Sequence, residues 1–242
     1  MAFAHEHDHH PPHHHRDVRG GGARAAVFGI SDGLVTNVSL VLGMAGASPG
    51  ASIVRLAGVA GLVAGSFSMA AGEYLSMRAQ RELMERELEV ERRALSDNPR
   101  AEAAELRGMY VRRGIEPGVA HDMAEEVMQD PDLALQTHAR EELGIETDRL
   151  GSPWQAAAAS FVTFALGAFI PLVPWLVTTG TAAVIWSVVL SAVAALIVGV
   201  VLANFTERPR LASALRQLAV TAVAAAVTYG VGRAVGTGVG TA

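Results

Sequence analysis

The chain has 242 residues, of which 50% are hydrophobic, and its formal net charge is −5. It contains no cysteine, and all 19 of its arginine or lysine residues are arginines. A disulfide framework and thiolate chemistry are therefore excluded. The acidic balance also argues against a nucleic-acid-binding protein, because such domains are typically basic.

The charge is concentrated in one part of the chain. Residues 78–150 hold 11 of the 19 arginines and 18 of the 24 acids. The remainder contains five apolar segments of membrane-spanning length, since a span needs about 20 predominantly apolar residues. These segments are residues 24–47, 52–77, 154–177, 181–204 and 211–236. Five such runs argue against the alternative, a soluble all-α protein with buried helices.

We therefore predict an all-α integral membrane protein with four parts. Residues 1–23 are a His-rich, disordered tail, 24–77 form transmembrane helices 1 and 2, 78–150 form an inserted helical domain, and 151–242 form transmembrane helices 3 to 5. The tail is polar and lacks the basic and apolar regions of a cleavable signal peptide. The arginine distribution places the N-terminus and the inserted domain in the cytoplasm and the C-terminus outside, in a multi-pass protein of the cell membrane.

The second span has no sequence signal that ends it at the membrane. Residues 73–95 contain neither proline nor glycine, so one helix is expected to continue into the cytoplasm and to end near Asn98. Asn98 and Asp130 each precede a proline, the pattern of a helix cap followed by proline in the first turn. Gly114 and Gly144 are good helix stops. Together these signals predict further short helices at 99–114, 117–129 and 131–144.

Acidic side chains recur at helical spacing in the inserted domain. Glu87 and Glu91 are four residues apart, Glu102 and Glu105 are three apart, and His138 is followed by Glu142 at four. Carboxylates and imidazole suit divalent ions such as Fe²⁺, Mn²⁺ and Zn²⁺. A solvated acidic face neutralised by neighbouring arginines explains the same pattern, so both interpretations stay open here.

Two acids fall inside the apolar segments. Asp32 lies in the first, and Glu73 lies in the second between Met69 and Met77, at a spacing of four. A charge at the bilayer centre costs roughly 2.5–3.5 kcal/mol, so such residues usually face a pathway or a partner. Thioether and carboxylate ligands together suit transition metals. A methionine stripe is also common in helix packing; its combination with two acids favours a cation path.

The first 15 residues contain seven histidines interspersed with acids and prolines. The composition is typical of a flexible metal-loading tail. A purification tag is the alternative, and the interruptions argue against it.

Three motifs resemble the vacuolar iron transporter family. They are FGISDGLVTN at 28–37, AGSFSMAAGEYLS at 64–76, and EELGIE at 141–146 followed by Ser152-Pro153. The resemblance implies five spans, a cytoplasmic three-helix metal-binding domain, and a homodimer with its pathway at the interface. It also implies export of Fe²⁺, and of Mn²⁺, from the cytosol by proton antiport. Protons, metal ions and the bilayer are then the partners, and no enzyme activity or tightly bound cofactor is expected.

The resemblance also assigns individual residues. Asp32 and Met69 match the intramembrane metal ligands of the family, with Glu73 and Met77 on the same stripe. In the inserted domain the matching positions are Glu91, Glu102, Glu105 and Glu142, and His138 is a further candidate ligand.

Four positions depart from the plant pattern. Gly61 and Ala94 replace glutamates, and His138 and Ala139 replace two consecutive methionines. His138 remains a competent ligand, whereas Ala139 does not. Glu73 is the expected substitute for the acid missing at Gly61. The cytoplasmic site is therefore expected to be weaker or less selective for iron, with Zn²⁺ or Co²⁺ also possible there.

An alternative from another class is a membrane-anchored metal buffer or ferroxidase. Di-iron sites in helical bundles use Glu-x-x-His pairs on two helices. Neither His121 nor His138 has a glutamate three residues before it, which argues against this alternative.

Overall fold

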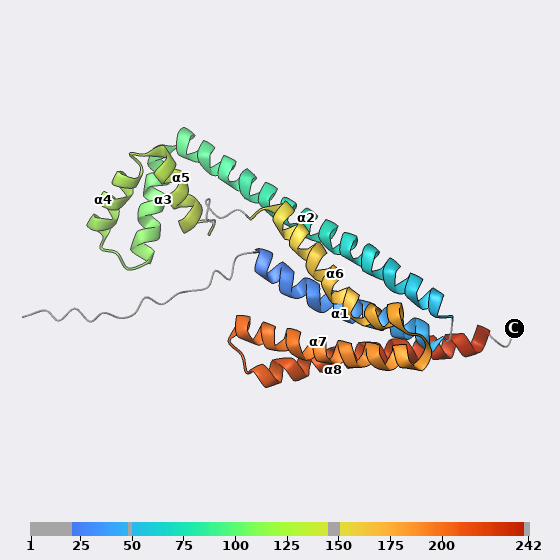
Figure 1. Cartoon of the computed structure of the whole chain (residues 1–242). Helices are drawn as coiled ribbons and strands as arrows, with labels where there is room; N and C mark the ends of the chain where they lie inside the picture. The colour runs from blue at the N-terminus through green and yellow to red at the C-terminus, as the bar shows by residue number, and fades with distance from the viewer. Residues whose placement is uncertain (1–20, 48–49, 145–150, 240–242) are drawn as a thin grey trace, which may run out of the picture.

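The computed structural model describes residues 21–47, 50–144 and 151–239, and every regular element in these ranges is an α-helix (Figure 1). The helices are α1 (Gly21–Gly46), α2 (Ala51–Asp97), α3 (Pro99–Arg112), α4 (Pro117–Val127), α5 (Pro131–Glu141), α6 (Pro153–Val177), α7 (Gly180–Thr206) and α8 (Arg210–Val239). Helix α1 begins at Gly21, so residues 21–23 are helical where a disordered tail was expected. The histidines of the tail lie outside the described residues.

Five helices are long and apolar enough to cross a membrane, namely α1, α2, α6, α7 and α8. Their outward side chains are apolar: Leu56, Val177 and Trp186 are 70%, 80% and 56% exposed. Hydrocarbon, unlike water, accommodates such a surface without cost. The predicted all-α fold with five membrane helices is confirmed, and the chain is a multi-pass membrane protein.

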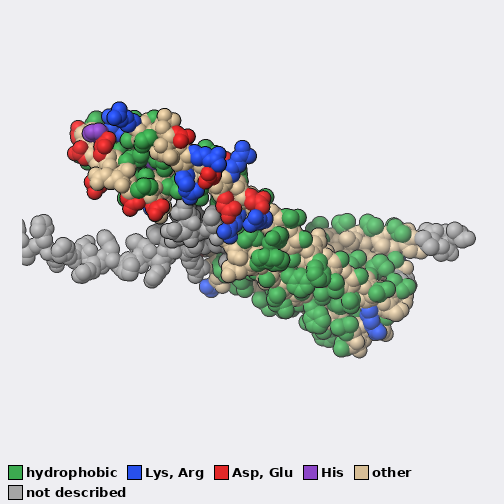
Figure 2. All heavy atoms as spheres, turned by 90° about the horizontal axis from the view of Figure 1, so that it is seen from above, with side chains coloured by type: hydrophobic (Ala, Val, Ile, Leu, Met, Phe, Trp, Pro, Cys, Tyr) green, Lys and Arg blue, Asp and Glu red, His purple; other side chains and the backbone are tan. Residues whose placement is uncertain are grey.

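Helix α2 is much longer than a membrane span. It has 47 residues, and its C-terminal half leaves the bundle and leads to α3, α4 and α5 at its far end (Figure 1). Acidic and basic side chains gather on this half and on α3–α5, whereas hydrophobic side chains dominate the surface of the bundle (Figure 2). The uninterrupted helix expected across residues 73–95 is confirmed, and it ends at Asp97.

Helices α1 and α6 pack with their backbones in close contact. A Cβ atom at Gly33 would collide with the carbonyl oxygen of Phe164, and one at Gly167 with that of Ile30. Close approach of this kind requires glycine on both helices. The contact runs along the centre of the bundle, where α1 also meets α8 and α7.

Polar side chains join helices within the bundle. The Asn37 side chain is fully buried, and its Nδ2 donates to the carbonyl oxygen of Ala168 on α6 at 2.5 Å. On α8, Gln217 Nε2 donates to Ser31 Oγ on α1 at 2.7 Å. Because the hydrocarbon region offers no water, such groups must find their partners inside the protein.

The helices of the inserted segment have their own small core. Leu106, Met109 and Tyr110 of α3 pack against Ala120 and Ala124 of α4. This core is separate from the apolar contacts of the membrane bundle, and it holds α3 and α4 together as a hairpin.

Helix ends in this segment largely follow the expected signals. Asp130 caps α5, accepting hydrogen bonds from the backbone N–H groups of Asp132 and Leu133. The expectation for Asn98 was wrong: it precedes α3, but its side chain makes no capping hydrogen bond. Its ψ of 56° departs from the extended backbone that aims a capping side chain at the first turn.

Candidate metal centre

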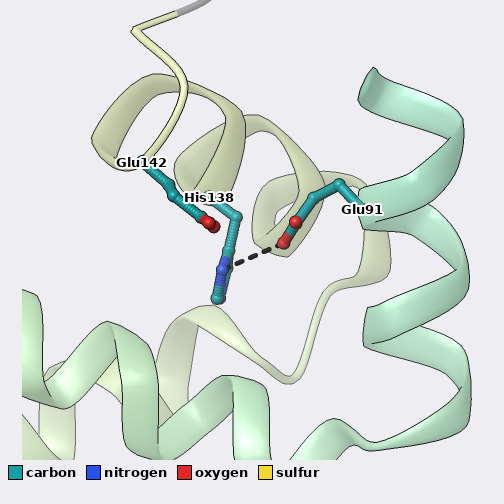
Figure 3. A group of neighbouring side chains, drawn as sticks. All are labelled: Glu91, His138 and Glu142. Carbon is teal, nitrogen blue, oxygen red and sulfur yellow. Dashed lines mark ion pairs between the residues drawn. The ribbon is translucent and has the colours of Figure 1, made fainter. Parts of the chain in front are cut away.

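Three of the predicted ligands come together at the far end of α2. Glu91 of α2, His138 of α5 and Glu142, which caps the C-terminal end of α5, place one possible ligand atom each within 4.8 Å of one another. Figure 3 shows the carboxylates of Glu91 and Glu142 on either side of the His138 side chain. His138 Nδ1 lies 3.1 Å from Glu91 Oε1. Glu102 Oε2 of α3 lies 3.8 Å from the same nitrogen. We call these four side chains the Glu91–His138 cluster.

Local helix geometry positions the α5 ligands. His138 and Glu142 are four residues apart, so both lie on one face of the helix. The Asp130 cap fixes where α5 begins, and Gly144, with a φ of +65°, lets the chain turn away after Glu142. The two ligands therefore lie at the C-terminal end of α5, His138 in its last turn and Glu142 at its C-cap, beside α2.

Two members of the cluster are buried, Glu102 is half-buried and Glu142 is exposed, and the three acids carry like charges. Glu91 is 7% exposed and His138 is 0% exposed. Burial, together with the negative charges of Glu142, Glu102 and Glu105, raises the pKa of Glu91 to about 7. Partial burial and the charge of Glu105 likewise raise the pKa of Glu142. Carboxylates crowded in this way hold a proton or a cation more readily than isolated ones.

The donor set fits a divalent transition metal. Glu91 Oε1 and both ring nitrogens of His138 are buried and make no hydrogen bond to any described residue. Oε1 and Nδ1 lie 3.1 Å apart, but buried polar atoms that make no hydrogen bond are costly, and a cation bound among them would satisfy the oxygen and one nitrogen. Carboxylate oxygens with one imidazole suit Fe²⁺, Mn²⁺, Co²⁺ and Zn²⁺.

Two further predicted ligands of this segment, Glu105 and Glu87, are not part of the group of three ligand atoms. Glu105 on α3 is exposed, and it acts on Glu91 and Glu142 through its charge. Glu87, one turn before Glu91 on α2, contributes no atom to the metal-sized group found among the described residues. Two of the departures from the plant pattern are alanines nearby: Ala139 is fully buried and Ala94 is half-buried.

The intramembrane candidates are distributed over two helices. Asp32 is exposed on α1 and accepts a hydrogen bond from Thr36 Oγ1 at 3.3 Å. Met69, Glu73 and Met77 follow one another along α2 and are half-buried. Within the described ranges, neither acid belongs to a group of three or more His or acidic side chains close enough to share an ion. Their assignment as ligands stays a prediction.

The neighbours of two α2 residues, Gly61 and Met77, are defined by glycine contacts. A Cβ atom at Gly61 would collide with Leu40 of α1, so this glycine allows close packing where plant relatives are expected to have an acid. A Cβ atom at Gly151 would lie 2.7 Å from the terminal methyl of Met77, which places that methionine at the start of α6.

Sequence reasoning missed one contact beside the cluster. Arg113, at the end of α3, forms an ion pair with Glu141, at the end of α5. The two residues are 28 positions apart on different helices, so helical spacing gives no signal for the pair.

Five membrane-spanning helices together with a carboxylate–imidazole cluster define an integral membrane protein with a candidate divalent-metal site. Comparison with known families agrees with this class. The model described as the VIT family matches residues 23–233, and the chain belongs to this family.

Named relatives cover nearly the whole chain. Vacuolar iron transporter 1 of Oryza sativa subsp. japonica is 32% identical over 237 residues, which is 98% of this chain and 93% of the relative. Vacuolar iron transporter 1 of Arabidopsis thaliana is 33% identical over 223 residues, or 92% and 88% of the two chains. A vacuolar iron transporter of Acanthamoeba castellanii is 38% identical over 152 residues, or 63% and 54%. The similarity therefore spans the bundle and the inserted helices alike.

Proposed function

We propose that this protein exports Fe²⁺ and Mn²⁺ from the cytosol across the cell membrane. The observation that carries the proposal is the Glu91–His138 cluster, whose Glu91 and His138 are buried and which is attached to the bundle by one continuous helix. The names of the relatives, vacuolar iron transporters, supply iron as the first candidate cargo. Mn²⁺ is the second candidate cargo, because divalent transition metals share ligand preferences.

The inserted helices lie on the cytoplasmic side in this proposal. Residues 78–150 hold 11 of the 19 arginines, and arginine-rich connections remain in the cytoplasm. The cluster then meets the metal first and raises its concentration near the cytoplasmic end of the bundle.

The membrane path runs from α2 toward α1. Glu73 and Met69 lie along α2, and Asp32 lies on the exposed side of α1. An aspartate that faced lipid would be costly, whereas one that faces a second subunit or an aqueous path is not. We therefore place the path between two copies of the chain, each contributing Asp32 and Met69.

Proton coupling follows from competition for the same oxygens. A carboxylate binds a metal ion only after it has lost its proton, so metal binding releases protons. If protons from the far side then displace the metal, the cycle is an antiport. Asp32 and Glu73 are the intramembrane groups that carry this exchange.

Metal flux and iron oxidation separate this proposal from a ferroxidase. Purified protein is placed in anaerobic liposomes that contain a metal-sensitive dye, and in aerobic detergent solution. We expect Fe²⁺ and Mn²⁺ to enter the liposomes, at a rate that His138→Ala lowers, and no protein-dependent oxygen consumption. Stoichiometric oxidation of Fe²⁺ without any flux would establish the buffer or ferroxidase instead.

A further inference from the structure

The Arg113–Glu141 ion pair joins the ends of two helices beside the Glu91–His138 cluster. Arg113 follows the last residue of α3, and Glu141 is the last residue of α5, directly before Glu142. The Glu141 side chain is 16% exposed, whereas that of Arg113 is 57% exposed. The carboxylate is thus mostly removed from water, and the guanidinium group reaches it from the surface.

The charges of Glu141 and Arg113 also act on the hydroxyl of Tyr110 on α3. Burial raises the pKa of the Tyr110 hydroxyl, the charge of Glu141 raises it further, and Arg113 opposes this effect. Tyr110 is also part of the α3–α4 core. The ion pair therefore connects the end of α5 to the end of α3, the helix that supplies Tyr110 to the α3–α4 core.

Helix α5 has few other contacts that hold it in place. Its buried residues are Ala134, His138 and Ala139, so the apolar area that it buries is small. Its last turn also brings Glu142 toward Glu91 and Glu102, and these negative charges repel one another when no cation lies between them. Metal-free α5 thus needs an attractive contact at this end.

We propose that Arg113 and Glu141 are positioning residues, which keep His138 and Glu142 beside Glu91 before a metal ion arrives. The pair opposes the repulsion at the end of α5 where it is greatest. It also occupies Glu141, so that this acid stays outside the metal-binding group although it is adjacent to Glu142. The inference rests on the proposed function, because it assumes that the cluster binds metal.

The test is Mn²⁺ binding to the full chain in detergent, measured from the loss of the six-line EPR signal of free Mn²⁺. The component abolished by His138→Ala reports the cluster. We expect Arg113→Gln and Glu141→Gln each to weaken that component by about three- to tenfold, the range for a partly buried ion pair. The charge-swapped Arg113→Glu/Glu141→Arg protein should return to within about twofold of the original affinity, and Arg113→Lys should lose less than Arg113→Gln.

A matched control and a second readout exclude a general effect on folding. Arg112→Gln removes the same charge from the adjacent, exposed position on α3 and should leave Mn²⁺ affinity unchanged. Hydrogen exchange of the α5 backbone amides should accelerate in metal-free Arg113→Gln and return to the original rate with saturating Mn²⁺.

Three results overturn the inference while leaving the metal site in place. They are unchanged Mn²⁺ affinity in Arg113→Gln and Glu141→Gln, equal weakening in Arg112→Gln, and failure of the charge-swapped protein to recover. A fourth result has a wider consequence: if His138→Ala binds Mn²⁺ like the original chain, the cluster is no metal site, and the inference fails together with that part of the proposed function.

Discussion

His138 is the residue on which the candidate site depends most. Its imidazole is fully buried, and Glu91 and Glu102 both approach Nδ1, at 3.1 Å and 3.8 Å. Burying carboxylates and an imidazole together costs stability unless a proton or a metal ion compensates. The arrangement is poorly suited to a merely structural role and well suited to binding a cation.

Glu91 and Glu87 allow a matched test on one helix. We expect Glu91→Gln to weaken Mn²⁺ binding at the cluster at least about tenfold, because the variant removes a buried anionic ligand. Glu87→Gln should change it by less than about twofold, because Glu87 is outside the metal-sized group of described residues. Calorimetric titration of both proteins measures the difference, and equal losses would place Glu87 in the site after all.

The raised pKa of Glu91 predicts an unusual pH dependence of stability. Its pKa is 4.5 in the unfolded chain and about 7 in the fold, so the folded state binds more protons between these values. The metal-free protein should therefore lose stability as the pH rises from about 4.5 to about 7, by on the order of 1–3 kcal/mol, and level off above. Thermal unfolding at pH 5.5 and pH 8 measures this, and Glu91→Gln should flatten the profile.

Mn²⁺ binding should have the opposite pH dependence to the stability of the metal-free protein. Deprotonation of Glu91 and Glu142 favours the metal, so affinity at the cluster should increase as the pH rises through about 7. An affinity that is constant between pH 6 and pH 8 would contradict the assignment of Glu91 as a ligand.

The sequence predicts the members of the cluster, but it does not predict which neighbouring acids lie outside it. Helical spacing alone pairs Glu87 with Glu91 and His138 with Glu142. Which of the two α2 acids meets α5 depends on where the helices cross, and the contact between His138 and Glu91 shows that they cross near Glu91. The Arg113–Glu141 pair depends on the same tertiary arrangement, so no local pattern reveals it.

At the scale of single elements, the contact between α1 and α6 depends on close backbone approach at two glycines. Gly33 and Gly167 lie against backbone atoms of the opposite helix, and a backbone cannot move aside as the end of a flexible side chain can. Adding a methyl group there must separate the two helices.

Alanine substitutions test this contact. Gly33→Ala or Gly167→Ala should destabilise the bundle by about 1–3 kcal/mol, the usual cost of overpacking, and lower the temperature at which the protein aggregates from detergent. Gly230→Ala is the control, because a Cβ atom at this position on α8 meets nothing within 4 Å. Equal loss in all three variants would mean that helix propensity or detergent contact, rather than the close approach, decides stability.

The ends of α3 and α5 were predictable because glycine favours the left-handed backbone conformation that follows them. Gly114 and Gly144 adopt φ values of +90° and +65°, the left-handed conformation that favours glycine. Glu116 was missed as the cap of α4, where it accepts from the N–H groups of Gly118 and Val119. Glutamate is not among the favoured capping residues, so residue preferences gave no indication of this role.

At the scale of the whole molecule, α2 is the only helix shared by the bundle and the inserted segment among those described. It carries Glu91 of the cluster and Glu73 of the membrane part on one continuous helix. The length of the apolar run predicted the membrane part, and the absence of proline and glycine predicted that the helix continues beyond it.

Interrupting α2 tests whether this rigidity matters. Ala79→Pro should kink the exposed segment between the two parts, because proline removes a backbone donor and costs about 3 kcal/mol inside a helix. We expect Mn²⁺ binding at the cluster to persist within about threefold while transport falls at least about fivefold. Ala79→Ser is the control, and transport at the original rate in Ala79→Pro would show that metal delivery needs no fixed path along α2.

The central claim, proton-coupled metal export through Asp32, is tested most directly by Mn²⁺ flux into proteoliposomes with and without an imposed pH gradient. We predict that an acidic lumen accelerates Mn²⁺ uptake and that the lumen becomes less acidic as Mn²⁺ enters. Asp32→Asn should lower the flux at least about tenfold, whereas Asp97→Asn, at the exposed end of α2, should leave it unchanged. Mn²⁺ uptake that is independent of the pH gradient, or that proceeds at the original rate in Asp32→Asn, would contradict the account.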